Sequence, residues 1–160
     1  MRLTSPSFEN AARIPERYTC DGDRFLSPPL AIADVPEAAQ SLVLIVDDPD
    51  VPKELREDGN FTHWVLFNIP PETSIIPEGA EAGTAGANTR GDACYIGPCP
   101  PSEYEPKTHR YFFKLYALDA TLDLLEGASK EDVEAVMRNH IIATAEIIGT
   151  YSKAQSSTAK

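Results

Sequence analysis

The sequence predicts a mainly β protein of the α+β class, with one helix near its C-terminus. Three runs of apolar, aromatic and β-branched residues have the length and composition of strands. A segment after residue 129 repeats its apolar residues at helical spacing. The 160 residues also include 14 prolines and 9 glycines, which favour many turns and few long helices.

The first predicted strand covers residues 41–46, which are apolar apart from the leading serine. A continuous apolar run of this length is typical of a buried central strand. The run stops at Asp48-Pro49, because proline has no N–H to donate to a neighbouring strand. Asp48 and Asp50 therefore follow the end of a buried strand, on a backbone that Pro49 and Pro52 make rigid.

The second predicted strand covers residues 61–69 and ends at a Pro-Pro pair. Side chains alternate between the two faces of a strand. This alternation places His63, Val65 and Phe67 on one face and turns Trp64 away from His63, into the core.

The third predicted strand covers residues 110–118. The same alternation places His109 and Tyr111 on one face, where they can converge. Arg110 points to the opposite face, and we expect it to form a salt bridge or a surface contact there.

The one convincing helix is predicted over residues 130–148. Ser129 and Asp132 resemble an N-terminal capping box, and Gly149 can end the helix. We expect its apolar stripe to pack on the sheet, with His140 at the edge of the core. The stripe comprises Val133, Val136, Met137, His140, Ile141, Thr144, Ile147 and Ile148.

The remaining segments predict loops around one domain. Residues 78–97 are rich in glycine and have no amphipathic period, which predicts a long surface excursion. A helical turn is also expected near residues 121–125. One domain is expected over residues 1–154, with a frayed tail at 155–160.

The charge balance argues against two classes of partner. The formal net charge is −11, so nucleic-acid backbones and anionic bilayers are unfavourable on electrostatic grounds. No apolar run is long enough to cross a bilayer, which argues against stable membrane insertion. The first residues lack the apolar stretch of a secretory signal, so we expect a cytoplasmic protein.

Three cysteines leave at least one thiol unpaired, and their spacing does not match a zinc site. A reducing cytoplasm favours free thiols. A bridge from Cys20 to Cys94 or to Cys99 is the alternative.

The histidines and aspartates predict an anion pocket. If Asp48 or Asp50 accepts a hydrogen bond from one nitrogen of His63 or His109, the other ring nitrogen can donate to an anion. Tyr111 would add an O–H donor. Backbone N–H groups near Gly97 and Cys99 could add further donors, and Pro101 with its neighbouring prolines would form rigid walls. Such a pocket suits a small oxyanion such as phosphate.

Two other functions compete with simple anion binding, and a third, docking on a protein target, is compatible with it. A hydrolase could use Cys99 beside His109, or His63 as a base oriented by Asp48. A metal could be held by the two histidines and one aspartate. The loops at 78–97 and 102–108 could dock on a protease or a kinase. No motif joins an obvious nucleophile to a base. The preferred hypothesis is therefore binding without catalysis, cofactor or metal.

A set of motifs along nearly the whole chain resembles the phosphatidylethanolamine-binding protein family, in its bacterial and archaeal Raf-kinase-inhibitor-like branch. The motifs fall in a fixed order: residues 5–10, 14–15, 18–22, 27–30, the segments around Asp48 and His63, 86–88, Gly91, 95–101, 109–111 and 116–119. The ordered set is far more specific than any single motif.

The resemblance implies a β-sandwich-like core around a large antiparallel sheet, a few peripheral helices and a shallow anion pocket. It also implies binding of phosphoryl groups, inhibition or modulation of kinases or proteases, and a homodimer as one expected state. Two departures stand out: Ile32 replaces a common tryptophan, and Glu103 and Glu105 precede His109 in a loop without the usual glycine. Carried over by position, the pocket residues are Asp48, Asp50, His63, Pro101, His109 and Tyr111, with Gly97 and Cys99 on the rim.

Overall fold

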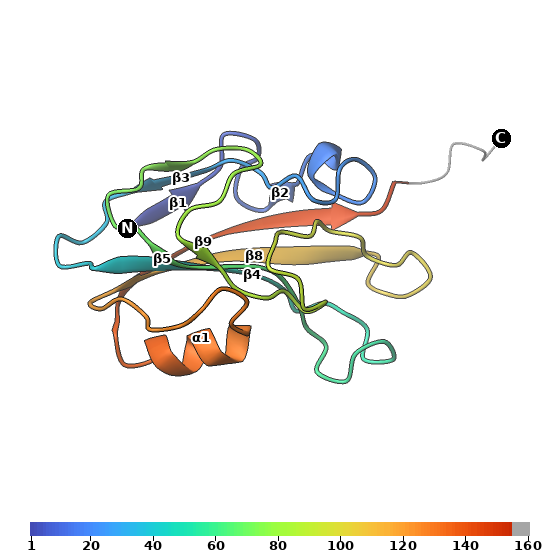
Figure 1. The fold of residues 1–160 in the computed structure, drawn as a ribbon. Coiled ribbons are helices and arrows are strands. Elements are labelled where there is room, and N and C mark those ends of the chain that lie inside the picture. Colours follow the sequence, from blue (N-terminus) through green and yellow to red (C-terminus); the bar gives the residue numbers. More distant parts are fainter. Residues whose placement is uncertain (155–160) are drawn as a thin grey trace.

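The computed structural model, which describes residues 1–154, has three layers: a small sheet, a large sheet and one α-helix (Figure 1). The small sheet has the order β1 (Arg2–Thr4), β3 (Leu30–Ala33), β6 (Ile75–Ile76). The large sheet has the order β2 (Ala12–Arg13), β9 (Ile141–Ser152), β8 (Thr108–Leu118), β4 (Ser41–Asp48), β5 (Phe61–Ile69), β7 (Thr84–Ala85). A 3-10 turn (Glu16–Tyr18) and α1 (Lys130–Met137) complete the described elements.

The fold class and the sandwich are confirmed. The large sheet is antiparallel except where β2 runs parallel to β9. All eight residues of β4 are buried, and β4 pairs with β5 on one side and β8 on the other. The predicted central strand is therefore central, and it runs two residues further, to Asp48. The bounds predicted for β5 are also observed.

Alternation along β4 supplies two separate cores. Leu44 and Val46 pack between the two sheets. Val43 and Ile45 pack on the opposite face, against α1. Burial of both faces explains why β4 is an unbroken apolar run instead of an alternating one.

A β-bulge at His63 reverses the alternation predicted for β5. Val46 pairs with Trp64, but the next residue, Asp47, pairs with Thr62, so His63 has no opposite residue. A bulge of this kind allows consecutive side chains to share a face. Trp64 accordingly packs in the core between the sheets, on the side where His63 meets Tyr111. Val65 and Phe67 lie on the helix side, so the prediction that they share a face with His63 was wrong.

The predicted helix over 130–148 is only partly correct. It begins as expected, because the Ser129 hydroxyl accepts a hydrogen bond from the Asp132 N–H at 3.0 Å. It ends at Met137, and residues 141–152 form β9, paired along the whole of β8. The β-branched residues of this segment favour a strand, and β8 would otherwise lack a partner on that side.

Two residues change their expected roles as a consequence. Gly149 ends no helix: it lies in β9, where an added Cβ would come within 2.4 Å of the Ile14 side chain. His140 follows α1 and pairs with Asp119 at 2.9 Å instead of lying in an apolar stripe.

The loops differ from expectation in detail. Residues 78–97 include β7, which pairs with β5, and the buried Tyr95 and Ile96, so this stretch is not purely a surface excursion. Residues 121–125 form no helical turn. The frayed tail predicted at 155–160 lies outside the described residues, and the single domain over 1–154 stays a prediction. No helix within residues 1–154 has the length and apolar character needed to cross a membrane.

Candidate functional site

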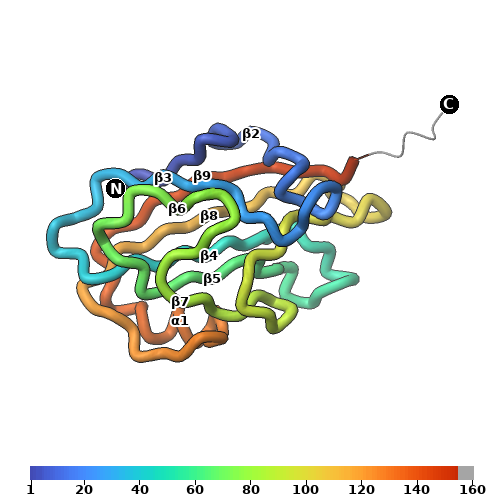
Figure 2. Tube along the Cα trace, turned by 45° about the horizontal axis from the view of Figure 1, so that its top comes forward, coloured from blue at the N-terminus to red at the C-terminus, as the bar shows by residue number. Residues whose placement is uncertain are grey.

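A cavity of about 470 Å³ opens at the end of the molecule where β4 ends and β8 begins. Four loops gather at this end, on the right of Figure 2: light blue near residue 20, teal near 55, yellow-green near 90 and yellow near 103. The wall comprises Cys20, Arg24, Asp48, Val51, Leu55, Arg56, Phe61, His63, Arg90, Ile96, Gly97, Cys99, Pro100, Pro101, His109 and Tyr111. All of the predicted pocket residues except Asp50 are among them.

His63 reaches the cavity because of the bulge in β5. Its Nδ1 lies 2.6 Å from the carbonyl oxygen of Ile96, so Nδ1 carries the proton and donates it. The ring is wedged between Phe61 and Tyr111, with ring centroids 4.7 and 5.2 Å away. Burial lowers the pKa of His63, which favours the neutral ring. In that tautomer Nε2 is a hydrogen-bond acceptor.

His109 is held by the carboxylate that follows the central strand. Its Nδ1 lies 2.6 Å from Asp48 Oδ2, and Asp48 Oδ1 accepts the N–H of Asp50 at 2.8 Å. Both side chains of the pair are almost fully buried. The predicted pairing of an aspartate with a histidine is therefore present, and it fixes the His109 ring with Nε2 as the remaining polar atom.

Tyr111 lies between the two histidines. It follows His109 by two residues on β8, so the two side chains share a face. The rings of Tyr111 and His109 are 6.4 Å apart, so the predicted convergence is confirmed. Burial, followed by the charge of Asp48, raises the pKa of Tyr111 far above its usual range, so the hydroxyl keeps its proton.

Three polar atoms at the inner end of the cavity lack partners. Within residues 1–154, His63 Nε2, His109 Nε2 and Tyr111 Oη are buried and make no hydrogen bond. Unpaired buried polar atoms are rare in folded proteins, and each one costs stability. Trp64 Nε1 is also unpaired, but Trp64 does not line the cavity and packs against Tyr95.

Asp50 does not belong to the cavity wall. Its carboxylate forms a two-point ion pair with Arg110, with nitrogen–oxygen distances of 2.9 and 2.8 Å. Hydrogen bonds from Arg110 lower the pKa of Asp50. The contact ties the loop after β4 to the start of β8, and it confirms the salt bridge expected for Arg110.

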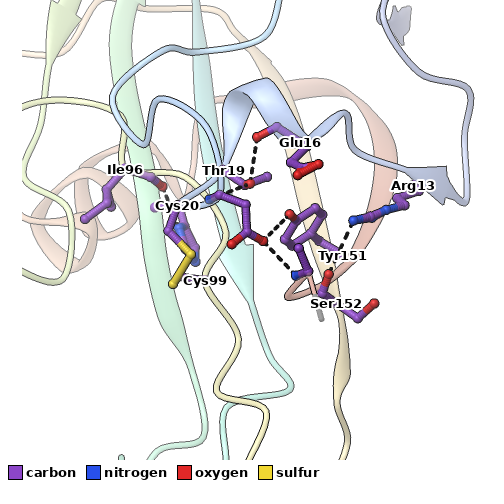
Figure 3. Close-up of a disulfide and its surroundings, with 11 residues drawn as sticks. Arg13, Glu16, Thr19, Cys20, Ile96, Cys99, Tyr151 and Ser152 are labelled. Atoms are coloured by element: carbon purple, nitrogen blue, oxygen red, sulfur yellow. Dashed lines mark hydrogen bonds between the residues drawn. A yellow bond between two sulfur atoms is a disulfide. The ribbon is translucent and has the colours of Figure 1, made fainter. Parts of the chain in front are cut away.

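A disulfide joins Cys20 to Cys99, so the prediction of free thiols was wrong for both (Figure 3). Cys94 is the free cysteine. The bridge links two walls of the cavity, and backbone bonds run beside it from Cys20 N–H to Pro98 O and from Gly97 N–H to Arg24 O. Tyr151 in β9 donates to Asp21, the residue that follows Cys20.

Gly97 and the prolines form a closely fitted wall. A Cβ on Gly97 would come within 2.2 Å of the Tyr18 carbonyl oxygen, so no other residue fits this packing. The Gly97 N–H already donates to Arg24 O and is not the anion donor that the sequence suggested. Glu103 and Glu105, which raised the prospect of repulsion, do not line the cavity.

Three arginines line the cavity that sequence reasoning missed: Arg24, Arg56 and Arg90. They come from three separate loops, and no local pattern marks them. Among the described residues, no group of three or more His, Cys, Asp or Glu side chains is arranged to share a metal ion.

Residues 4–152 match the sequence profile of the phosphatidylethanolamine-binding proteins. The chain belongs to this family. A UPF0098 protein of Chlamydia pneumoniae is 49% identical over 154 residues, covering 96% of this chain and 99% of the relative. A UPF0098 protein of the archaeon Methanothermobacter thermautotrophicus is 46% identical with the same coverage.

Two solved structures share the fold. The phosphatidylethanolamine-binding protein homolog CT736 from Chlamydia trachomatis has a TM-score of 0.89 and 48% identity, covering 96% of this chain and 97% of its own. YbcL of E. coli, described as a member of the mammalian family, has a TM-score of 0.83 and 28% identity, covering 96% and 98%. The family resemblance inferred from the motifs is thus confirmed, with relatives in bacteria and archaea.

Proposed function

We propose that the protein is a non-catalytic binding protein for a small oxyanion, and in particular for a phosphoryl group. One observation carries the proposal: three buried polar atoms, His63 Nε2, His109 Nε2 and Tyr111 Oη, belong to side chains of one cavity and have no partner within residues 1–154. A bound ligand would supply the missing hydrogen bonds.

The hydrogen-bonding character of these atoms favours a monoanionic phosphate or phosphate ester. Such a ligand carries both a P–OH donor and unprotonated acceptor oxygens. His63 Nε2 would accept from the P–OH, since its Nδ1 proton is committed to Ile96 O. Tyr111 would donate to an oxygen. His109, whose Nδ1 is held by Asp48, would present Nε2 to a further oxygen of the ligand.

Binding requires a small adjustment of the wall. The exposed fractions of His63, His109 and Tyr111 are 5%, 1% and 1%, so their polar atoms lie just beneath the cavity surface. Changes in side-chain rotamer are common when proteins bind ligands. The ligand group that enters must also be small, which again suits a phosphate.

The composition of the wall supports binding over catalysis. Its members within residues 1–154 include no serine, threonine or lysine, and the two cysteines are joined to each other. Tyr111 keeps its proton and is a poor nucleophile. The hydrolase alternative is reduced to a water activated by His63 or His109.

A regulatory role is the second part of the proposal. The loop at 102–108 leads directly into His109, so an occupied cavity could bias the position of this loop and its contact with a kinase or a protease. Homodimer formation and a cytoplasmic location remain predictions.

The test is thermal unfolding with increasing inorganic phosphate. A ligand present at ten times its Kd stabilises the folded state by about 1.4 kcal/mol, which raises Tm by about 4 °C for a chain of this size. The wild type should show this shift, and His109→Ala should lose it. His140→Ala, which changes a histidine outside the cavity wall, serves as the matched control and should keep the shift.

Two results would overturn the proposal. One is the absence of any shift with inorganic phosphate or phenyl phosphate at millimolar concentration. The other is turnover: release of phosphate from phenyl phosphate that depends on His63 or His109 would show an enzyme.

A further inference from the structure

The cavity has an electrostatic character opposite to that of the chain. The whole sequence has 25 acidic side chains against 14 lysines and arginines. The charged residues of the cavity wall are three arginines and one carboxylate, Asp48. That carboxylate is already engaged by His109. The wall therefore carries a net positive charge within a strongly acidic protein, and a local field of this sign attracts anions.

Two of these arginines differ from the third in having no acidic partner among residues 1–154. Arg24 and Arg90 are exposed, and neither forms an ion pair with a side chain in the described part of the chain. Arg56 donates from Nε to the Asn60 carbonyl at 2.8 Å and lies 3.4 Å from Asp58. Arg24 and Arg90 are exposed and Arg56 is half-buried, whereas the histidines are buried. We call the outer part of the wall that carries these three arginines the mouth.

The size of the cavity exceeds the needs of a phosphate ion. Pockets of about 300–1,000 Å³ hold drug-sized molecules, and this one measures about 470 Å³. Apolar side chains contribute much of the remaining wall: Val51, Leu55, Phe61 and Ile96. Leu55 is 48% exposed, so an apolar surface extends to the mouth and would be covered by a ligand body.

We propose that the cavity binds an elongated ligand with two anionic groups: a phosphoryl group at His63, His109 and Tyr111, and a second anionic group at Arg24, Arg56 and Arg90, joined by an apolar body. The inference rests on the proposed function, because the inner phosphoryl group anchors the molecule. A guanidinium pairs well with the planar carboxylate or with a second phosphate, so either chemistry fits the mouth.

The experiment compares three probes by isothermal titration. Inorganic phosphate fills only the inner end, phenyl phosphate adds the apolar body, and 4-carboxyphenyl phosphate adds a second anion. Aryl phosphates with the carboxylate on a longer arm vary the separation of the charges. The second anion should tighten binding by up to about tenfold at low salt, the sum of several exposed pairs. This gain should shrink at 0.5 M NaCl, because salt screens exposed charges.

Matched variants assign the gain to the mouth. Arg24→Gln/Arg90→Gln removes two exposed cations from the wall. Arg2→Gln/Arg138→Gln removes two exposed cations that do not line the cavity, so its net charge equals that of the first variant. The first variant should weaken phenyl phosphate binding modestly, because it lowers the positive local field. It should also lose most of the additional gain that the carboxylate gives. The second should keep that gain.

The outcomes separate the two proposals. If aryl phosphates bind and His109→Ala abolishes binding, but no carboxylate-bearing probe gains affinity, the second subsite is rejected and the proposed function stands. An equal loss of the gain in both double variants would also reject it, since the effect would then be one of net charge. If no phosphate probe binds, both proposals fail.

Discussion

Asp47 and Asp48 are neighbours at the end of β4, and they face opposite sides of the large sheet. Both are buried, with exposed fractions of 4% and 3%. Asp47 faces the helix side, where it accepts from the Thr62 hydroxyl at 2.9 Å and lies 3.0 Å from Lys130 Nζ. Asp48 faces the cavity, where it holds His109.

The two sides differ in what they leave unsatisfied. Around Asp47 a hydroxyl and a lysine close the network, and Lys114 lies 3.9 Å away. The network of Asp48 ends at His109 Nε2, which has no partner in residues 1–154. His63 Nε2 and Tyr111 Oη, in the same cavity, also have none there. A closed buried network contributes to stability, whereas an open one keeps hydrogen-bonding capacity that a ligand can use. The comparison separates a structural carboxylate from one suited to binding.

The largest effect should come from exchanging the two charges for amides. Asp47→Asn leaves Lys130 without its counter-charge and should cost about 3 kcal/mol of unfolding free energy, with phosphate affinity unchanged. Asp48→Asn should cost less, because the asparagine amide oxygen can still accept the hydrogen bond from His109 Nδ1, while phosphate affinity falls about tenfold. Urea unfolding and phosphate titration measure the two effects. Equal losses of phosphate affinity in both variants would contradict the distinction between a structural Asp47 and a ligand-binding Asp48.

An intermediate effect is expected from pH. Burial lowers the pKa of His63 in the folded state, so the unfolded chain binds more protons below its ordinary value of about 6.5. The contribution of this residue to stability is complete above that pH. It should decrease from pH 7 to pH 5, with a slope of at most about 1.4 kcal/mol per pH unit. His63→Asn should flatten the decline in unfolding free energy measured over this range. Arg110 lowers the pKa of the Asp50 carboxyl below its ordinary value of 3.8. The stability that this carboxyl contributes is therefore lost only at more acidic pH than the range measured here. An unchanged slope in His63→Asn would contradict the assignment of a neutral ring.

The smallest effect compares two buried tyrosines. The Tyr95 hydroxyl donates to the Tyr18 carbonyl at 2.9 Å, so Tyr95→Phe should cost about 1 kcal/mol. The Tyr111 hydroxyl has no partner in the described chain, so Tyr111→Phe should leave stability unchanged or slightly higher. Phosphate affinity should fall several-fold in Tyr111→Phe alone. A stability loss in Tyr111→Phe as large as that in Tyr95→Phe would show that this hydroxyl is already satisfied.

Much of the fold could be predicted, because its strongest signals are local. The apolar run of β4 and the aromatic run of β5 identify strands wherever their partners lie. Ser129 caps the helix through an Asp132 N–H three residues away. The segment after Met137 was misassigned because its isoleucines recur at a spacing that suits a helix as well as a strand. Pairing with β8, more than twenty residues earlier in the chain, settles the choice.

The part of the candidate site that regular strands position could be predicted from the sequence. Strand ends and the alternation of side chains were enough to predict the positions of Asp48, His109 and Tyr111. His63 reaches the same cavity for a different reason, since the bulge depends on how β4 and β5 are paired. Asp50 resembled Asp48 in sequence, but Arg110 turned its carboxylate away from the cavity.

By itself, the sequence determined the mainly β fold, the central strand, the start of the helix and the family, because each depends on composition, short-range pattern or the order of motifs. Only the tertiary structure decided the bulge at His63, the strand at 141–152, the Cys20–Cys99 bridge and the arginines around the cavity. These features join residues from distant segments, and no local pattern encodes which distant segments meet. The positive mouth of an acidic protein is therefore a property of the folded chain.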